Sequence, residues 1–432
     1  MILASLALLL FAVMGVPLFI VILASAMLGF ASSDVDLTVV AIEFYRIVDM
    51  PVLVAIPLFT LAGYILSESG ASQRLVALIQ SLFGWMPGGL AIVSLIACAF
   101  FTALTGASGV TIVALGALIY PALKQAGYGD RFSMGLITSS GSLGLLFPPS
   151  IALILYGIIA QQLNVAEPIL IDDLFVAGLL PGLLMLAMLS VYSMWVEKQK
   201  ADSSIAEKHS VFDFHEIGKS IRASIWEIPL PFVILGGIFS GYFAISEAAA
   251  VAVIYVLIVE VLIYKDISVA QLPEIMREAM VLVGAIIVIL GASLASTNYL
   301  IDTEVPTRLF DVIREHIDSK ITFLLLLNVF LLVLGTMLDI FSALVIMIPI
   351  LLPIAVGYGI HPVHLGIVFL ANMQIGYFTP PIGMNLFIAS YRFKKPIIEL
   401  YLSTIPYMVI LLLALAIITY WPALSLSLIS SK

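Results

Sequence analysis

Charged side chains are scarce in this sequence: Asp, Glu, Lys and Arg together account for 10% of its 432 residues. A soluble protein of this size carries about 25% charged residues, so the composition is not that of a soluble domain. The net charge of −9 gives no indication of a nucleic-acid partner. The single cysteine, Cys98, lies in an apolar run and excludes a disulfide framework.

Hydrophobic residues make up 62% of the chain, and its mean hydropathy is +1.19. Apolar runs of about 20 residues recur, the length that an α-helix needs to cross a bilayer core of about 30 Å. A membrane β-barrel would show short alternating segments instead. Residues 1–30 lack a basic start and are too long for a signal peptide, so we expect a retained first helix. The sequence predicts an all-α polytopic membrane protein.

Two proline motifs of the same kind occur far apart in the chain, LGLLFPPSI at 143–151 and IGYFTPPIG at 375–383. Further Gly and Pro residues pair at the same offset. Chance similarity between apolar runs would align leucines, but it would not keep helix-breaking residues in register. The sequence therefore predicts an internal duplication. The matched pairs are Pro121 and Pro353, Gly127 and Gly359, Gly144 and Gly376, Pro148 and Pro380, and Pro149 and Pro381.

Each predicted repeat contains an interrupted hairpin and an interrupted helix. Each half of a hairpin is shorter than the roughly 20 residues of a comfortable span, so we expect re-entrant hairpins with tips near the midplane. The hairpins occupy 88–122 and 322–356, with breaks at 105–109 and 335–339. The broken helices occupy 131–162 and 363–390, with breaks at 141–149 and 376–383. Amphipathic arms are predicted at 70–87 and 302–320, and one further span at 225–242.

Basic residues predict the orientation, because cytoplasmic loops carry an excess of Lys and Arg. A Lys-rich polar linker at 197–220 and the cluster Arg392, Lys394 and Lys395 are therefore expected in the cytoplasm. Counting predicted spans from this linker places the N-terminus in the cytoplasm and the C-terminus outside. The two repeats then run in opposite directions through the membrane. Inverted repeats with broken helices are typical of secondary transporters, whose binding sites lie at the breaks.

Polar side chains gather at the four breaks. A helix start has free N–H groups that attract anions, and a helix end has free C=O groups that bind small cations. The alternative is that Gly and Ser stand there to let helices approach closely. The side chains concerned are Thr105, Ser108, Thr111, Ser139, Ser140, Ser142, Ser150, Thr336, Ser342, Asn372, Gln374, Thr379 and Asn385.

Asp339 is the only acidic residue between Thr322 and Ser390, a stretch without Lys or Arg. An intramembrane carboxylate costs roughly 2.5–3.5 kcal/mol on insertion scales and is a functional candidate by default. A bound cation would supply its counter-charge; capping of the following helix is the other role open to it. The oxygen donors at the breaks suit a hard cation, so we expect Na⁺ and no transition metal.

Other ionisable residues receive structural interpretations. His361 and His364 stand in a loop beside a proline, and Glu227 and Glu260 lie near membrane ends, so these four are expected at the membrane interface. Glu247 is expected at a helix N-terminus, where a carboxylate is favoured. No His is expected at membrane depth, and no residue set for an enzyme is present.

Four segments resemble a known family: GLLFPPS, YFTPPIGMNLF, SEAAAVAV and TALTGASGVTIVALGALIYPAL. They resemble the large membrane subunit of tripartite ATP-independent periplasmic (TRAP) transporters, of the DctM or SiaM type, and the similarity covers nearly the whole chain. The resemblance implies the ion-transporter-superfamily fold, with a transport domain that moves as an elevator on a scaffold. The implied division is 1–87 scaffold and first arm, 88–196 first transport repeat, 197–224 cytoplasmic linker, 225–320 scaffold and second arm, and 321–432 second transport repeat.

The resemblance also implies Na⁺-driven import of an organic acid across the bacterial inner membrane: a C4-dicarboxylate, sialic acid or a related sugar acid. A periplasmic substrate-binding protein (P type) would deliver the acid, and a small four-helix membrane subunit (Q type) would pack on the scaffold. The second hypothesis is a stand-alone Na⁺-coupled carboxylate carrier that needs no binding protein. An intramembrane enzyme, a structural scaffold and a channel are further alternatives.

Carried onto this sequence, the family pattern implies two Na⁺ sites and a substrate site at the breaks. The first Na⁺ site comprises Thr105, Gly106, Ser139, Ser140 and Gly141, with Ser108 at the same hairpin tip. The second comprises Gly335, Thr336, Asp339, Asn372, Gly376 and Thr379. The substrate is expected between the tips, its carboxylate on helix N-termini and hydroxyls, near Ser108, Ser142, Pro149, Ser150 and Pro380.

Overall fold

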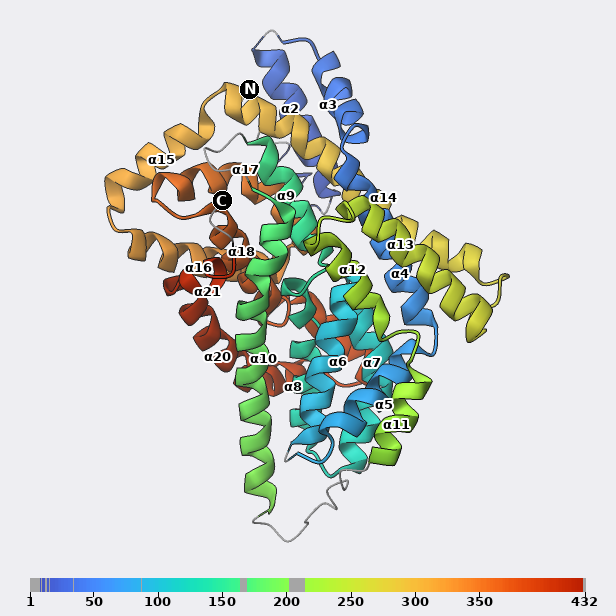
Figure 1. Cartoon of the computed structure of the whole chain (residues 1–432). Coiled ribbons are helices and arrows are strands. Elements are labelled where there is room, and N and C mark those ends of the chain that lie inside the picture. The colour runs from blue at the N-terminus through green and yellow to red at the C-terminus, as the bar shows by residue number, and fades with distance from the viewer. Residues whose placement is uncertain are drawn as a thin grey trace.

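The computed structural model describes residues 8, 10–11, 14, 16–33, 35–86, 88–163, 169–201 and 214–429 (Figure 1). These residues are helical almost throughout. Eight of their helices are long and apolar enough to cross a membrane, or nine if a bent pair counts as one span. The prediction of an all-α polytopic membrane protein is confirmed.

The first half of the chain ends in the long helix α10, which reaches the lower end of the view in Figure 1. Its elements are α2 (Leu18–Ser32), α3 (Thr38–Val48), η1 (Pro51–Val54), α4 (Ala55–Glu68), α5 (Ala71–Phe83), α6 (Gly89–Thr105), α7 (Ser108–Gln125), α8 (Asp130–Ser140), η2 (Leu143–Leu146), α9 (Ile151–Gln162) and α10 (Ile171–Ala201).

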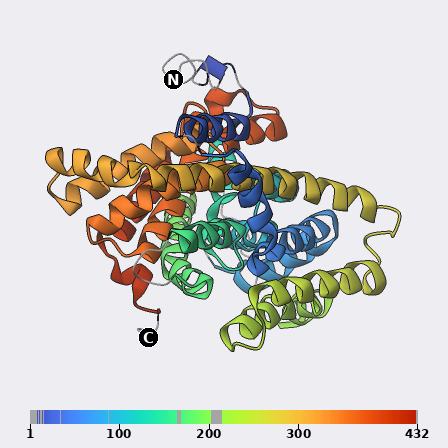
Figure 2. The same cartoon turned by 90° about the horizontal axis from the view of Figure 1, so that it is seen from above.

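The second half contains a helix of the same length, α14, which packs against α2, α4 and α17 and lies across the molecule when seen from above (Figure 2). The elements are α11 (Phe214–Ala223), α12 (Pro229–Phe239), α13 (Ile245–Leu257), the π-helical η3 (Ile258–Ile263), α14 (Leu272–Asp302), α15 (Val305–His316), α16 (Lys320–Met337), α17 (Ile340–Gly357), α18 (Pro362–Gly376), α19 (Met384–Phe393), α20 (Ile397–Tyr420) and α21 (Ala423–Leu426).

Element boundaries repeat at the offset that relates the two proline motifs. Both ends of α7, Ser108–Gln125, match those of α17, Ile340–Gly357, and the starts of α8 and α18 match as well. The predicted duplication is therefore visible in the helices and in the breaks between them. The peptide bonds Pro148-Pro149 and Pro380-Pro381 are both cis.

The two halves interlock. α7 packs against α19 of the second half, and α17 packs against α9 of the first. Within each half, α6 packs against η2 and α16 against α18. All 15 residues of α18 are buried, including the polar side chains of His364, Asn372 and Gln374. Each return helix of a hairpin is thus held by the broken helix of the other half.

Two predicted boundaries are wrong. The span expected at 225–242 is the 11-residue helix α12, too short to cross a bilayer core, because Pro229 sets a late start and Gly241, at φ 75°, follows its end. The second hairpin was expected to break at 335–339, but α16 continues to Met337. Gly335 and Thr336 are therefore helical, and the break is confined to 338–339.

The polar linker expected at 197–220 is helical at both ends, where α10 continues to Ala201 and α11 begins at Phe214. Glu, Lys and Gln are good helix formers, so polarity alone does not end α10. Residues 202–213 lie outside the described residues. Most of residues 1–15, the first part of the helix expected at 1–30, also lie outside the described residues. α2 covers the later part of that helix.

Glu227 and Glu260, which the sequence predicts near membrane ends, are both buried within the protein. Both bind Arg74 of α5: Nη2 lies 2.9 Å from Glu260 Oε2, and Nε donates to Glu227 Oε1. Nη1 lies 2.6 Å from Asp266 Oδ2, and the guanidinium stacks 3.8 Å from the centre of the Tyr264 ring. Carboxylates can be buried when a cation pairs with them. Here the cation is Arg74, which lies more than 150 residues earlier in the chain, so the local sequence around the two glutamates gives no sign of this pairing.

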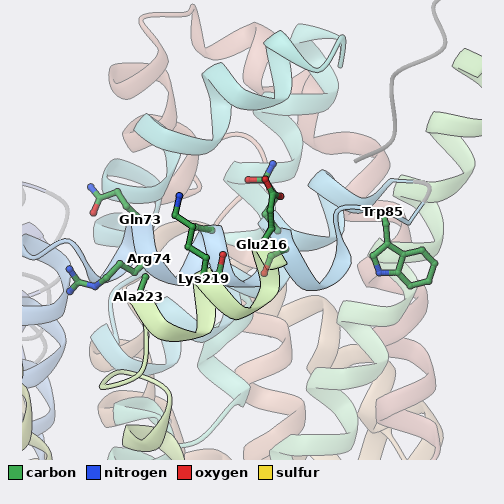
Figure 3. A pocket seen from close by; sticks show the side chains of 10 residues that line it. Gln73, Arg74, Trp85, Glu216, Lys219 and Ala223 are labelled. Carbon is green, nitrogen blue, oxygen red and sulfur yellow. The ribbon is translucent and has the colours of Figure 1, made fainter. Parts of the chain in front are cut away.

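The first amphipathic arm is the helix α5, and α11 packs against it. A groove of about 520 Å³ lies between the two helices (Figure 3). Gln73 and Arg74 of α5 and Glu216 and Lys219 of α11 are among its lining residues. A second amphipathic helix therefore lies beside the arm.

Replacing Gly144 by alanine is expected to destabilise the fold. A Cβ there would lie 2.3 Å from Ala99 O and 2.4 Å from Ala103 N, both backbone atoms of α6. Overpacking of this kind costs about 1–3 kcal/mol. The measurement is thermal unfolding of the purified protein in detergent.

Gly284→Ala on α14 is the matched control, because a Cβ there meets nothing within 4 Å and alanine is favoured in a helix. It is expected to match or exceed the stability of the wild type. A Gly144→Ala protein as stable as this control would contradict the close contact between η2 and α6.

Candidate functional site

The first hairpin is interrupted at Gly106 and Ala107, between α6 and α7. Gly106 has φ 67°, a left-handed conformation that favours glycine. α7 begins at Ser108 without a side-chain cap. The N–H groups of Ser108, Gly109 and Val110 have no acceptor among the described residues. The N-terminus of α7 can therefore bind an anion.

The second hairpin is interrupted just before α17, and there the helix start is capped. Asp339 Oδ1 accepts hydrogen bonds from the N–H groups of Phe341 and Ser342, each at 3.0 Å, and Oδ2 accepts from the Ser342 hydroxyl. The N–H of Ile340 donates to the Tyr377 hydroxyl. The capping role that the sequence left open for Asp339 is confirmed.

The two hairpin starts differ because two side chains differ between the repeats. At the offset that pairs Pro148 with Pro380, Ala107 stands where Asp339 stands, and Leu145 stands where Tyr377 stands. Neither alanine nor leucine can accept a hydrogen bond through its side chain. The start of α7 is therefore open where the start of α17 is closed.

Both breaks line one cavity of about 310 Å³. The open N-terminus of α7 and the carboxylate of Asp339 lie on its wall, and most of the rest of the wall is apolar. The cavity can therefore offer N–H groups to an anion and carboxylate oxygen to a cation. The lining residues are Tyr64 of α4, Gly106 to Val110, Leu145, Leu282, Ala285, Ile286 and Ile289 of α14, Asp339 to Phe341, Tyr377 and Met384.

Of the five residues predicted to bind substrate, Ser108 lines this cavity, and its hydroxyl donates to Asn385 Oδ1 at 2.8 Å. The other four lie outside the lining. The Ser142 hydroxyl donates to the backbone oxygen of Gln374 at 2.9 Å. Ser150 caps α9, and two further residues belong to the cis peptide bonds, namely Pro149 and Pro380.

The residues of the first predicted Na⁺ site are all buried, three of them at the end of α8 and two at the tip of the first hairpin. The hydroxyls of Ser139 and Ser140 bond carbonyls of their own helix, Gly135 O at 2.8 Å and Ile137 O at 3.4 Å. Gly141 O accepts from the Thr102 hydroxyl at 2.8 Å, and that hydroxyl is also 2.7 Å from Thr111 Oγ1. Thr102 was not singled out from the sequence. The last two members are Thr105 and Gly106, at the tip of the first hairpin.

The second predicted set lies on α16, at the start of α17, on α18 and just after α18. Gly335 and Gly376 meet where α16 crosses α18, since a Cβ on Gly376 would lie 2.7 Å from Gly335 Cα. Asn372 lies one turn before Gly376, whereas Asp339 lies at the cavity and caps α17. The two threonines bond carbonyls of their own segments at 2.8 Å: Thr336 to Val333 O and Thr379 to Ile375 O.

Asn372 offers a fitting oxygen for a hard cation. Its Oδ1 is buried and has no hydrogen-bond partner among the described residues. Amide oxygens are ligands that hard cations accept. Within the described part of the chain, no three His, Cys, Asp or Glu side chains are grouped to hold a metal ion.

His364 is buried within the protein, at 2% exposure. Its Nδ1 lies 3.2 Å from Ser425 Oγ and its Nε2 3.2 Å from Thr419 O. His364 is buried because it lies in the first turn of α18, a helix that is buried along its whole length. Asn328 of α16 was also missed, although it is the only polar side chain between Thr322 and Thr336.

Residues 3–424 match the family model described as "Tripartite ATP-independent periplasmic transporter, DctM component". Over 406 residues the chain is 33% identical to the C4-dicarboxylate TRAP transporter large permease protein DctM of Rhodobacter capsulatus. The match covers 92% of this chain and 91% of that protein. Over 419 residues it is 31% identical to the sialic acid TRAP transporter large permease protein SiaM of Vibrio cholerae, with 97% and 95% covered.

The fold is similar to that of the YdaH transporter of Alcanivorax borkumensis, a crystal structure described as having an unusual topology. The TM-score is 0.66 at 14% sequence identity, and the similarity covers 90% of this chain and 89% of that one. Identity this low supports the fold alone.

Replacing Asp339 by alanine is expected to lower the free energy of unfolding by about 1 kcal/mol, since it removes the cap from two N–H groups of α17. Asp339→Asn is expected to retain most of the stability, because asparagine caps a helix as well as aspartate does. Thermal unfolding of the purified proteins compares the two. Equal losses in both variants would contradict capping as the source of the stabilisation.

Proposed function

This chain belongs to the DctM component family of tripartite ATP-independent periplasmic (TRAP) transporters, and we propose that it is the large permease subunit of a Na⁺-coupled importer of an organic acid. The observation that carries the proposal is the shared cavity, where the open N-terminus of α7 and the carboxylate of Asp339 face the same space. The first suits an anion and the second a cation, and a symporter of an organic anion with Na⁺ needs both.

The proposed substrate is an organic anion whose carboxylate binds the N–H groups of Ser108, Gly109 and Val110. A helix N-terminus favours an anion through these free groups and through the helix dipole. The apolar wall formed by α14 would contact the carbon skeleton. The relatives are named for a C4-dicarboxylate and for sialic acid. Both are carboxylates, which supports an acid of this kind or a related sugar acid.

Na⁺ is the proposed coupling ion. Asp339 provides negative charge at the cavity, and Asn372 Oδ1 provides a buried oxygen without a donor among the described residues. Hard cations bind such oxygens in preference to nitrogen or sulfur. The two Na⁺ sites that the family pattern implies, one at each hairpin, are part of this proposal.

The proposed mechanism is an elevator. The repeats at 88–196 and 321–432 would move together against a scaffold of 1–87 and 225–320, with 197–224 as linker. Support comes from the cavity, which lies between the hairpin breaks and two helices of the scaffold, α4 and α14. The proposal includes re-entrant hairpins, inverted repeats, a place in the bacterial inner membrane, a cytoplasmic N-terminus and a periplasmic C-terminus.

Two protein partners are proposed: a periplasmic substrate-binding protein and a small four-helix membrane subunit that packs on the scaffold. The family is described as a tripartite periplasmic transporter, which supports both. A stand-alone carrier has no comparable support, because the relatives reported above are named as large permeases of TRAP transporters.

Uptake into proteoliposomes tests the proposed function. The vesicles would contain this chain and its small subunit, with the binding protein outside and a labelled panel of C4-dicarboxylates, sialic acid and sugar acids. Uptake of at least one acid is expected only with both an inward Na⁺ gradient and the binding protein. Asp339→Asn is expected to raise the Na⁺ concentration needed for half-maximal uptake, because it removes the negative charge.

The possible failures are distinguishable in this assay. Uptake without the binding protein would favour the stand-alone carrier, and uptake that ignores Na⁺ would contradict the proposed coupling. No uptake of any acid on the panel would contradict the substrate class.

Filling the cavity from the scaffold side is expected to block uptake. Ala285 lines the cavity on α14, so Ala285→Phe would occupy part of its volume and lower uptake at least about tenfold, a change of about 1.4 kcal/mol in the limiting step. The control is Gly284→Phe, one position earlier, where an added side chain begins in open space. Equal uptake by the two variants would contradict the cavity as the substrate site.

A further inference from the structure

Three buried polar side chains form a chain of hydrogen bonds from α18 through α16 to α20. Asn372 and Thr419 are fully buried and Asn328 is 7% exposed. Asn372 Nδ2 donates to Asn328 Oδ1 at 2.7 Å, and Asn328 Nδ2 donates to Thr419 Oγ1 at 3.1 Å. Polar groups in an apolar interior are costly unless they are satisfied, so such a chain strongly constrains the side chains in it.

The neighbours of Asn372 decide which way its amide faces. Nδ2 also lies 2.8 Å from the backbone oxygen of Val368, an atom that can only accept. A rotated amide would place oxygen against oxygen at that contact. Nδ2 must therefore lie on this side, and its two hydrogens are used by Val368 and Asn328.

Asn328 is itself held from its other side. Its amide contacts the hydroxyl of Thr419 at 3.1 Å through Nδ2 and at 3.4 Å through Oδ1. The backbone oxygen of the same Thr419 lies 3.2 Å from His364 Nε2, which links α20 back to α18. Asn328 is thus held between Asn372 on α18 and Thr419 on α20, and these two helices pack against each other.

This arrangement leaves Asn372 Oδ1 as a fixed acceptor. It is buried and has no partner within the described residues. A buried acceptor without a partner costs about 1–3 kcal/mol, so the site favours a ligand that supplies positive charge or a donor. Asn372 lies one turn before Gly376, where the α18 backbone meets Gly335 of α16.

We propose that Asn328 is a positioning residue for cation binding: it holds the Asn372 amide so that Oδ1 is kept as a ligand for Na⁺. The inference rests on the Na⁺ coupling proposed above and assigns a role to a residue outside the predicted sites. Residues that orient a metal ligand typically change metal affinity about 10- to 100-fold when replaced.

The test compares Na⁺ binding in three variants. Asn328→Leu removes the acceptor for Asn372 Nδ2, and Thr419→Val removes the partner that holds Asn328. The control is Thr404→Val on the same helix, since Thr404 is also fully buried but bonds only carbonyls of its own helix, Leu400 O at 3.0 Å and Tyr401 O at 3.2 Å.

The first measurement is the melting temperature of purified protein titrated with NaCl, at an ionic strength held constant with choline chloride. A cation that binds the folded state raises this temperature, so the titration gives a Na⁺ midpoint without transport. Asn328→Leu is expected to raise the midpoint about 10- to 100-fold, Thr419→Val several-fold in the same direction, and Thr404→Val not at all.

A merely structural role would lower the melting temperature equally in both salts and leave the midpoint unchanged, and that result would overturn the inference. If the wild type shows no Na⁺-dependent stabilisation, the proposed coupling itself fails. If Asn328→Leu does not fold, Thr419→Val decides the question, and a wild-type midpoint in that variant would equally overturn the inference. Na⁺ titration of uptake, with substrate saturating, is expected to shift in the same order.

Discussion

Backbone that leaves the helix inside an apolar protein must find partners for its N–H and C=O groups, and the structure depends on how it meets this constraint. The start of α17 is satisfied by the carboxylate of Asp339 and the hydroxyl of Tyr377. The start of α7 has no such partner among the described residues, because Ala107 and Leu145 occupy the equivalent positions. A duplicated fold thus acquires two unlike helix starts, and both line one cavity.

Buried polar groups elsewhere obey the same constraint through contacts between distant segments. Arg74 of α5 pairs with Glu260 and Glu227, which makes an arm helix part of the interior. Asn328 bonds Asn372 and Thr419, which joins three helices. Three buried side-chain oxygens have no donor among the described residues, namely Glu260 Oε1, Asn372 Oδ1 and Gln374 Oε1. The oxygen of Asn372 is the basis of the proposed cation ligand.

Much of the fold followed from the sequence, because its determinants are local or periodic. Apolar runs of the length of a bilayer predicted the helices, and glycine and proline in register predicted the duplication, since both residues act on the backbone where they stand. The two hairpin breaks, at 106–107 and 338–339, lie within the longer ranges that were predicted in this way. The later end of α16 and the shortness of α12 were not, because helix ends depend on packing as well as on propensity.

The sequence by itself thus determined the membrane class, the repeat and the residue types that gather at the breaks. Only the tertiary structure decided which of them meet. It brought Ser108 and Asp339 to one cavity, and Ser142 and Ser150 to hydrogen bonds outside that cavity's lining. It also buried Glu260 and His364 beside partners from other helices. The physical reason is that a polar side chain is placed by its hydrogen-bond partner, and a partner on another helix leaves no trace in local sequence.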